Sequence, residues 1–186
     1  MRRVTPEDLM IKRIAVTALL IAFATLFLVT LPSAAPASVT LNDYEKQVLA
    51  LVNKERTERH LAKLTVSAKL TNAAREHSTE MGLLQYFTHD SASGETWNKR
   101  IIRFGYTPKG YRYWRAGETL FWGAGLCSSP VNVVDSWMAS PSHKKTILTK
   151  VFRQAGVGAV RSSEGYGECT EDVWFFTFDL GRRIAL

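Results

Sequence analysis

The sequence is poor in cysteine and lacks the short motifs that mark several large enzyme classes. Two cysteines in 186 residues exclude a disulfide-rich miniprotein and any four-cysteine zinc or iron–sulfur site. The chain also has no phosphate-binding loop, no dinucleotide-binding glycine fingerprint, no His-Glu-x-x-His pair and no Gly-x-Ser-x-Gly string. We therefore do not expect a nucleotide-dependent enzyme, a zincin or a serine hydrolase of the usual kinds.

The composition is that of a globular protein with a modest excess of positive charge. Hydrophobic residues make up 46% of the chain and charged residues 22%, and 24 Lys and Arg against 17 Asp and Glu give a net charge of +7. The first 37 residues hold four basic and two acidic side chains, which leaves +5 on the 149 residues that follow. This excess suits contact with an anionic envelope or membrane surface, but the basic residues form no stripe that predicts a nucleic-acid partner.

Residues 1–37 have the pattern of an export signal. The stretch Ile14–Leu31 contains no charged residue and no glycine, and four basic residues precede it. A positive region followed by an apolar stretch directs the rest of the chain out of the cytoplasm. Its eighteen residues are long for a cleaved signal and just long enough to span a bilayer. The segment is therefore either cleaved after Ala35-Pro36-Ala37 or kept as a membrane anchor, in both cases as an apolar helix outside the globular domain.

Residues 38–186 predict one domain in which helices come first and strands last. Apolar residues at helical spacing and capping residues predict helices that start after Thr40, Ser67, Thr96 and Ser129, and Pro141 begins a short turn that carries His143. Two β-rich runs, Ala155–Val160 and Val173–Phe178, predict an antiparallel hairpin. The stretch from Gly105 to Gly125 is rich in glycine and aromatic residues and fits a loop wall or a strand. This layout predicts an α+β fold in which helices cover the sheet.

Several short motifs follow one another along this domain. They are Leu51-Val52-Asn53-x-x-Arg56, Ala74-x-x-His77-Ser78-x-x-Met81, Phe87-Thr88-His89, Gly94-x-Thr96 with Arg100, Gly117-Glu118, Trp137-Met138-x-Ser140-Pro141-x-His143 and Gly156-Val157-Gly158. In this order and at this spacing, the chain from Leu41 to Gly181 resembles the CAP superfamily (cysteine-rich secretory proteins, antigen 5, pathogenesis-related 1) in its short bacterial SCP-like form. The resemblance implies a three-layer α/β/α sandwich around a short, mostly antiparallel sheet.

The resemblance also implies a cleft in which two histidines and acidic residues meet. Carried over by position, these residues are His89, Glu118 and His143. Ser140 stands where many relatives have a second glutamate, so we expect it at the rim of the cleft. His77 differs from the other two histidines, because it lies on the apolar face of its predicted helix and is expected to be a hydrogen-bonded core residue.

These groups suit more than one kind of chemistry. His89, His143 and Glu118 could hold Zn²⁺ weakly, with both imidazoles within about 8 Å of each other and binding that falls below about pH 6.5. The same groups could act as a general acid and base, or Glu118 could bond backbone amides while the histidines brace loops. The missing second carboxylate favours binding over catalysis.

The sequence therefore leaves a short set of functional hypotheses. The first is an exported or anchored module that binds a lipid, glycan or peptide at the cell envelope. The alternative is a metal-assisted or acid–base hydrolase that acts on envelope peptides or glycans, and a third is a purely structural or adhesive domain. Export into an oxidising compartment also predicts a disulfide between Cys127 and Cys169.

Overall fold

The computed structural model describes residues 38–186. The predicted apolar helix Ile14–Leu31 and the cleavage site at Ala35-Pro36-Ala37 lie outside these residues. Within the described part of the chain, no helix is both long enough and apolar enough to cross a membrane.

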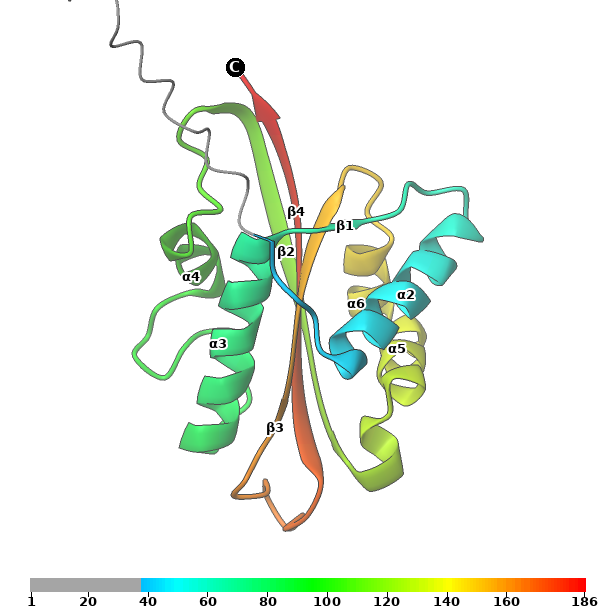
Figure 1. Ribbon diagram of the computed structural model, residues 1–186, viewed down its shortest axis with the longest axis vertical. Helices are drawn as coiled ribbons and strands as arrows, with labels where there is room; N and C mark the ends of the chain where they lie inside the picture. Colours follow the sequence, from blue (N-terminus) through cyan, green and yellow to red (C-terminus); the bar gives the residue numbers. More distant parts are fainter. Residues whose placement is uncertain (1–37) are drawn as a thin grey trace, which may run out of the picture. The chain divides into compact units, whose positions relative to one another are not determined.

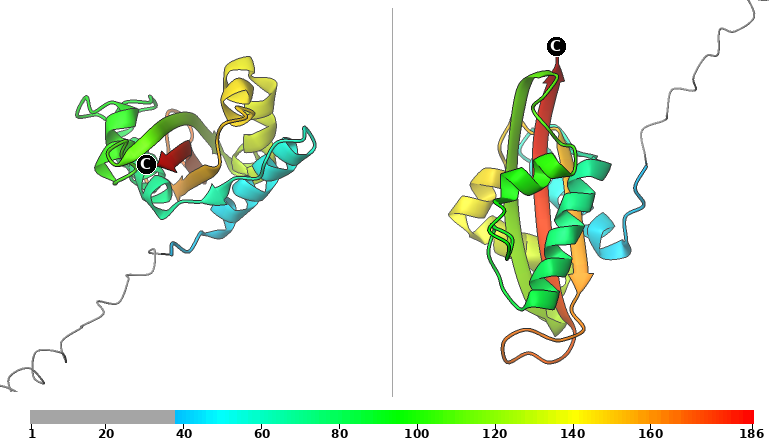
Figure 2. Two further views of the ribbon diagram at one scale, coloured as in Figure 1. Left: turned by 90° about the horizontal axis from the view of Figure 1, so that it is seen from above. Right: turned by 90° about the vertical axis from the view of Figure 1, so that its left-hand side faces the viewer.

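The described residues form a four-stranded sheet with helices on both faces (Figure 1). The strand order is β1-β3-β4-β2, in which β4 pairs antiparallel with β2 and β3, and β1 pairs parallel with β3. The strands are β1 (Thr65–Val66), β2 (Tyr111–Ala124), β3 (Gln154–Arg161) and β4 (Val173–Ala185). Helices α3 (Ala68–Leu84) and α4 (Trp97–Arg103) cover one face, and α2 (Asp43–Thr57), α5 (Pro130–Ala139) and α6 (Pro141–Ile147) cover the other. The predicted mixed α+β fold is thus confirmed, and the view from above shows the sheet between the two helical layers (Figure 2).

Most helices begin where local capping chemistry predicts them. Ser67 caps α3, and Ser129 caps α5 with Pro130 in its first turn. The first helix is the exception, because Asn42 rather than Thr40 is its cap. The Asn42 side chain accepts from the Glu45 N–H, and the Glu45 carboxylate accepts from the Asn42 N–H in return. This reciprocal capping box satisfies two backbone donors, which a cap at Thr40 would not.

The strands are longer than the β-rich runs of the sequence. The glycine- and aromatic-rich stretch forms the fourteen-residue strand β2, and β4 continues seven residues beyond Phe178 to Ala185. These extensions pair with each other from Tyr111 opposite Ala185 to Ala124 opposite Val173. Ladder pairing with β4 therefore selects the strand from the two alternatives, a loop wall or a strand, that the local composition left open.

Three apolar clusters fill the space between the sheet and the helices, one on the α2 and α5 side and two on the α3 side. On the α2 and α5 side, Trp137 packs beside Phe178, with ring centroids 5.7 Å apart. On the α3 side, glycines let the helix backbone touch the strand. A Cβ atom added to Gly156 or Gly158 would lie 2.1 or 2.4 Å from backbone atoms of α3. This close approach fixes α3, and with it the loop that follows α3.

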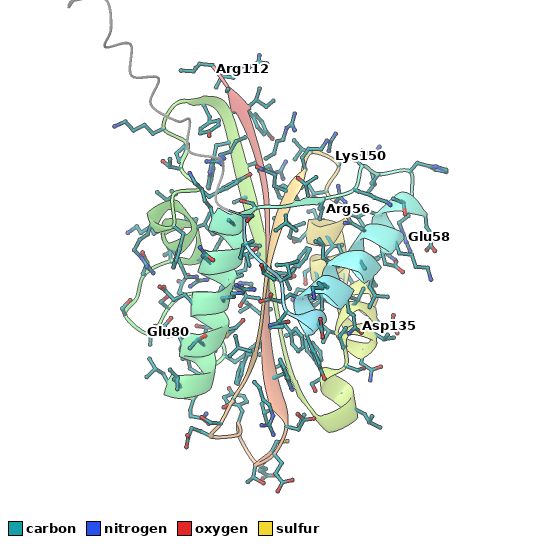
Figure 3. The ribbon with its side chains drawn as sticks, viewed as in Figure 1. Arg56, Glu58, Glu80, Arg112, Asp135 and Lys150 are labelled. Carbon is teal, nitrogen blue, oxygen red and sulfur yellow. The ribbon has the colours of Figure 1, made fainter. Side chains whose placement is uncertain are left out.

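Arg56 fastens the segment around α6 to α2 from inside the protein (Figure 3). Its guanidinium is fully buried and donates to the carbonyls of Ala62, Ile147, Thr149 and Phe152. Burial lowers the pKa of this guanidinium from its usual value, with a smaller contribution from the positive charge of Arg153. Because α6 carries His143, Arg56 helps to set the position of one predicted site residue.

The predicted disulfide is not formed in the described structure. Cys127 is exposed in the short 3-10 helix Gly125–Ser128, and both it and Cys169 are free. Cys169 lies in the connection between β3 and β4, where its N–H and C=O pair with Tyr166. Its side chain packs against an apolar cluster that includes Phe175, while Cys127 faces solvent. This arrangement corrects the disulfide prediction, because the two thiols occupy different environments rather than one shared contact.

Candidate functional site

A buried ion pair beneath an exposed histidine forms the centre of the site. The Arg100 Nη2 atom donates to Glu118 Oε2 at 2.6 Å, and the His89 Nδ1 atom lies 2.8 Å from Glu118 Oε1. The side chains of Arg100 and Glu118 are 0% and 1% exposed, whereas that of His89 is 50% exposed. One buried carboxylate therefore holds an imidazole whose other side faces solvent.

The hydrogen bond to Glu118 decides which nitrogen of His89 is available for chemistry. A carboxylate oxygen can only accept, so the Nδ1 atom must carry the proton and donate to Glu118. In the neutral imidazole the Nε2 atom then has a free lone pair. His89 can thus accept a proton or a hydrogen bond from a molecule in the cleft.

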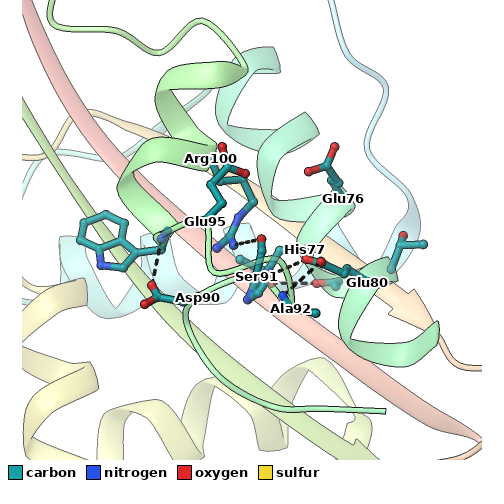
Figure 4. Close-up of polar contacts among 12 residues, drawn as sticks. Glu76, His77, Glu80, Asp90, Ser91, Ala92, Glu95 and Arg100 are labelled. Carbon is teal, nitrogen blue, oxygen red and sulfur yellow. Dashed lines mark hydrogen bonds and ion pairs between the residues drawn. The ribbon is translucent and has the colours of Figure 1, made fainter. Parts of the chain in front are cut away.

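The loop that carries His89 is tied down by several polar contacts (Figure 4). Arg100 also donates to Ser91 Oγ and to the His89 carbonyl, each at 3.0 Å. Asp90 accepts from the backbone N–H of Trp97 at 3.1 Å. These contacts fasten the loop between α3 and α4 to the first turns of α4, so the imidazole stands on a rigid support.

His77 supports the same loop from α3, which the sequence predicted only as a core role. It is fully buried, and its Nε2 atom donates to the Thr88 carbonyl at 2.8 Å. Burial lowers the pKa of His77, and the nearby positive charge of Arg100 lowers it further. A neutral imidazole therefore holds the residue that directly precedes His89.

The cleft above these groups is a pocket of about 700 Å³ over strand β2. Its walls come from the His89 loop and α4 on one side and from α6 on the other. Eight residues line it: Thr88, His89, Asp90, Trp97, Ala116, Gly117, Glu118 and Thr146. A pocket of this size, with polar groups that converge on it, can hold a small molecule or a short segment of a polymer.

The other two predicted site residues lie on or next to α6. His143 is half-buried, and its pKa is lowered by burial and then by the positive charge of His89. The two imidazoles are thus close enough to interact electrostatically, although His143 is not among the residues that line the pocket. Ser140 links α5 to α6 and lies 3.2 Å from the Ser142 hydroxyl, and it does not line the pocket either.

The described residues do not fit the zinc site that the sequence suggested. Between residues 38 and 186, no group of three or more His, Cys, Asp and Glu side chains is arranged to hold a metal ion. Both oxygens of Glu118 are already engaged, one by His89 and the other by Arg100. A cation at this carboxylate would also meet the buried guanidinium, which repels it. We therefore derive no chemistry from a metal here.

Asp179 is a second buried carboxyl group at the site and was missed from the sequence. It lies on β4 directly opposite Glu118 of β2 and is 0% exposed. Burial raises the pKa of Asp179 well above its usual range, and the negative charge of Glu118 raises it further against the opposing effect of Arg100. Burial and the charge of Glu118 thus both favour the protonated form of Asp179. A lone acid inside the apolar run 173–180 was the signal that could have revealed it.

Replacement of Asp179 by Asn tests this protonated state through the pH dependence of stability. Above about pH 4 the unfolded wild-type chain loses this proton at a lower pH than the folded protein does, so the free energy of unfolding falls as the pH rises between the two pKa values. Asn does not titrate, so we expect the stability of Asp179→Asn relative to wild type to increase from pH 4 to pH 8. The expected gain is about 1.4 kcal/mol for each unit by which the pKa is raised.

Urea unfolding at several pH values measures this difference, and Asp135→Asn is the control. Asp135 is an exposed acid on α5, so its replacement should give no comparable trend (Figure 3). A stability difference for Asp179→Asn that stays constant between pH 4 and pH 8 would show that Asp179 is ionised in the folded protein.

The sequence of this domain matches the model of a known protein family. Residues 49–180 match the family described as CAP: Cysteine-rich secretory protein family. This chain belongs to the CAP family. The resemblance found in the order of the sequence motifs is therefore confirmed.

CAP relatives of known sequence include two longer proteins of Bacillus subtilis (strain 168). The uncharacterized protein YkwD is 35% identical over 130 residues, which cover 70% of this chain and 47% of that protein. The uncharacterized membrane protein YlbC is 30% identical over 117 residues, which cover 63% of this chain and 32% of that protein. The chain thus spans less than half the length of these relatives.

Solved CAP structures from outside the cytoplasm share the fold. An outer surface protein of Borrelia burgdorferi superposes with a TM-score of 0.62 at 20% identity, covering 80% of this chain and 99% of that one. An extracellular protein of Bacillus anthracis that contains an SCP domain gives a TM-score of 0.57 at 25% identity, covering 78% of this chain and 45% of that one. The first likeness shows the fold alone, and both neighbours are surface or extracellular proteins.

Proposed function

We propose that this CAP domain acts outside the cytoplasm and binds a polar ligand of the cell envelope in the cleft over β2. The observation that carries the proposal is the fixed, half-exposed imidazole of His89 above the buried Arg100–Glu118 pair. Support for the location comes from the export pattern of residues 1–37 and from the surface and extracellular proteins that share the fold.

The buried Arg100–Glu118 ion pair carries a larger desolvation penalty than a purely structural attachment of the loop would need. Removing two charges from water carries a desolvation penalty that their attraction repays only with good geometry and further hydrogen bonds. At this site those bonds go to Ser91, the His89 carbonyl and the His89 ring, and each of them fixes the position of the imidazole. The arrangement therefore favours a histidine that is held ready for a ligand.

The lining of the pocket favours a polar ligand over a lipid chain. Trp97 is the one large apolar side chain among its eight lining residues, and the others are small or carry polar groups. Burying an acyl chain would require a wide apolar groove, whereas hydroxyl, imidazole and carboxylate groups suit a peptide or a glycan. We therefore narrow the expected ligand to these two classes.

A hydrolase is the second candidate, and the His89–Glu118 hydrogen bond is the observation that favours it. A carboxylate that fixes the tautomer of an imidazole leaves the Nε2 atom able to take a proton from a water molecule. Mass spectrometry of soluble cell-wall fragments before and after incubation separates the two functions. Binding alone leaves the fragment masses unchanged, whereas hydrolysis produces new fragments.

Replacing His89 with Asn tests the proposed function directly. We expect the affinity for soluble cell-wall fragments to fall about 10- to 150-fold, because the variant loses a hydrogen bond of an imidazole held by a charged group, worth about 1.5–3 kcal/mol. The melting temperature should change by no more than about 4 °C, since the side chain is half exposed. Calorimetric titration and thermal unfolding of the full-length protein measure the two quantities.

The matched control is His60→Asn at an exposed residue after α2. His60 has a φ of 57°, which asparagine tolerates, so this replacement should alter neither affinity nor melting temperature. If His89 only braces its loop, His89→Asn will instead lower the melting temperature sharply, and the wild-type protein will show no affinity to lose.

A further inference from the structure

Among the strands of residues 38–186, none covers the second edge of β2. In the order β1-β3-β4-β2 it pairs only with β4, and it lies at the border of the sheet in the right-hand view of Figure 2. An uncovered edge presents a row of N–H and C=O groups that can pair with another extended chain. Which residues present those groups follows from the register of the ladder.

Two backbone hydrogen bonds fix which residues of β2 face outward. The Gly125 N–H donates to the Asp172 carbonyl at 3.1 Å, so at this end of the ladder an odd-numbered residue faces β4. The Ser162 N–H donates to the Val173 carbonyl at 2.8 Å, so the backbone groups of Val173 face β3. The backbone groups of the even-numbered residues of β4 therefore face β2. Adjacent residues of a strand alternate in direction, so the even-numbered residues of β2 face away from β4.

The position of Leu120 agrees with this assignment. Its carbonyl accepts from the indole Nε1 of Trp137 at 2.9 Å, and Trp137 lies on α5 outside the sheet. The register is continuous from Tyr113 to Ala124, so the same alternation holds for Ala116 and Glu118.

Ala116 and Glu118 present their outward groups inside the cleft. Both residues line the pocket, as does Gly117 between them. Among residues 38–186, no hydrogen bond from outside the strand ladder reaches the N–H or C=O of either residue. Two donors and two acceptors therefore point away from the ladder at the cleft, along about 7 Å of strand.

Three cations lie on the α6 side of the cleft, next to the residues that line it rather than among them. Lys144 and Lys145 lie on α6, and Arg115 lies on β2 with its guanidinium over the Phe152 ring on the α6 side. No acidic residue occurs in 96–117 or in 136–163, and none of these three cations forms an ion pair within the described residues. The α6 side of the cleft is thus positively charged, whereas the opposite wall carries the exposed acid Asp90.

We propose that the cleft binds an acidic peptide in extended conformation, as an added strand along Ala116 and Glu118. This inference rests on the proposed function, because it uses the same cleft, and it selects the peptide from the two ligand classes. An extended peptide supplies N–H and C=O groups at the spacing of the strand edge, which a glycan does not. Its side chains alternate between the wall of His89 and Trp97 and the wall of Thr146, and a carboxylate on the Thr146 side lies toward the cations of α6 and away from Asp90.

Proline scanning of the strand edge tests the added strand in the full-length protein. Ala116→Pro removes an outward N–H and leaves the ladder with β4 intact, a position at which proline is tolerated. The probe is a library of end-blocked five-residue peptides that each contain Asp or Glu. We expect Ala116→Pro to bind the library at least tenfold more weakly than wild type. The matched control Ala124→Pro makes the same change at an outward residue of β2 outside the pocket, and should bind like wild type.

The same peptides with methylated backbone nitrogens give a test that needs no variant. Methylation removes the backbone N–H donors of the peptides, so it should abolish their binding to the wild-type protein. In a separate measurement, an excess of the unmodified library should protect the Ala116 and Glu118 amides from hydrogen exchange. Equal binding of methylated and unmodified peptides would overturn the added strand.

Peptide-free glycan chains distinguish failure of this inference from failure of the proposed function. If glycans bind and His89→Asn weakens that binding while the peptides do not bind, the cleft is functional and the peptide inference is wrong. If neither probe binds, both are wrong. Binding of the peptides with loss in Ala116→Pro but not in Ala124→Pro supports both.

Discussion

Replacing Arg100 with Met is expected to destabilise the folded protein by about 3–5 kcal/mol. The guanidinium is fully buried and donates to Glu118, to Ser91 and to the His89 carbonyl. Methionine keeps much of the side-chain volume but leaves the Glu118 carboxylate buried without its cation, beside Asp179. Urea unfolding at neutral pH measures the loss.

Two further variants make this prediction specific. Arg103→Met removes an exposed arginine of the same helix that pairs with Glu76 and Glu95, and should cost about 1 kcal/mol or less. The double variant Arg100→Met/Glu118→Gln should recover part of the lost stability, because it also removes the unpaired charge. If Arg100→Met costs no more than Arg103→Met, the Arg100–Glu118 pair does not hold the site together.

Gly156→Ala is expected to destabilise the protein by about 3 kcal/mol or more. The added methyl group would lie 2.1 Å from backbone atoms of Leu70 and Thr71, and a helix backbone cannot rotate away as a side chain can. The helix α3 must shift outward, which also moves His77 and the Thr88 carbonyl that it holds. We therefore expect weaker ligand binding together with the loss of stability.

Gly82→Ala is the control for this replacement. Gly82 also lies at the contact between α3 and the sheet, but its added methyl group would meet only ordinary contacts at 3.5 Å or more. We expect a change of about 1 kcal/mol or less, since alanine also favours the helix. Thermal unfolding of both variants measures the contrast, and equal effects would contradict the close packing of α3 on Gly156.

The sequence predicted the helix starts well and the strand lengths poorly, for one physical reason. A cap such as Ser67 acts on backbone groups within three residues, so its signal is local. The same local chemistry makes Asn42 the cap of the first helix instead of Thr40, because Glu45 completes the capping box with Asn42. The strand β2 depends on pairing with β4 about sixty residues later, and no pattern within its own glycine-rich segment expresses that partner.

In the candidate site, too, local signals in the sequence were predictive and contacts between distant segments were not. The motif order located His89 and Glu118, which the structure brings into contact. It could not show that Arg100 occupies the second oxygen of Glu118 or that Asp179 lies opposite it, because both contacts form only when separate elements pack. The zinc hypothesis requires a free Glu118 carboxylate, whereas His89 and Arg100 already engage its two oxygens.

Histidine-selective NMR tests most directly whether the cleft at His89, Glu118 and Arg100 binds an envelope ligand. The four histidines of the chain serve as probes and controls in one titration of the full-length protein with soluble cell-wall fragments. The account predicts that the His89 signals shift most and those of His143 less, while those of His60 and buried His77 stay in place. Signals that all remain unchanged at saturating fragment concentration, or a His60 shift as large as that of His89, would contradict it.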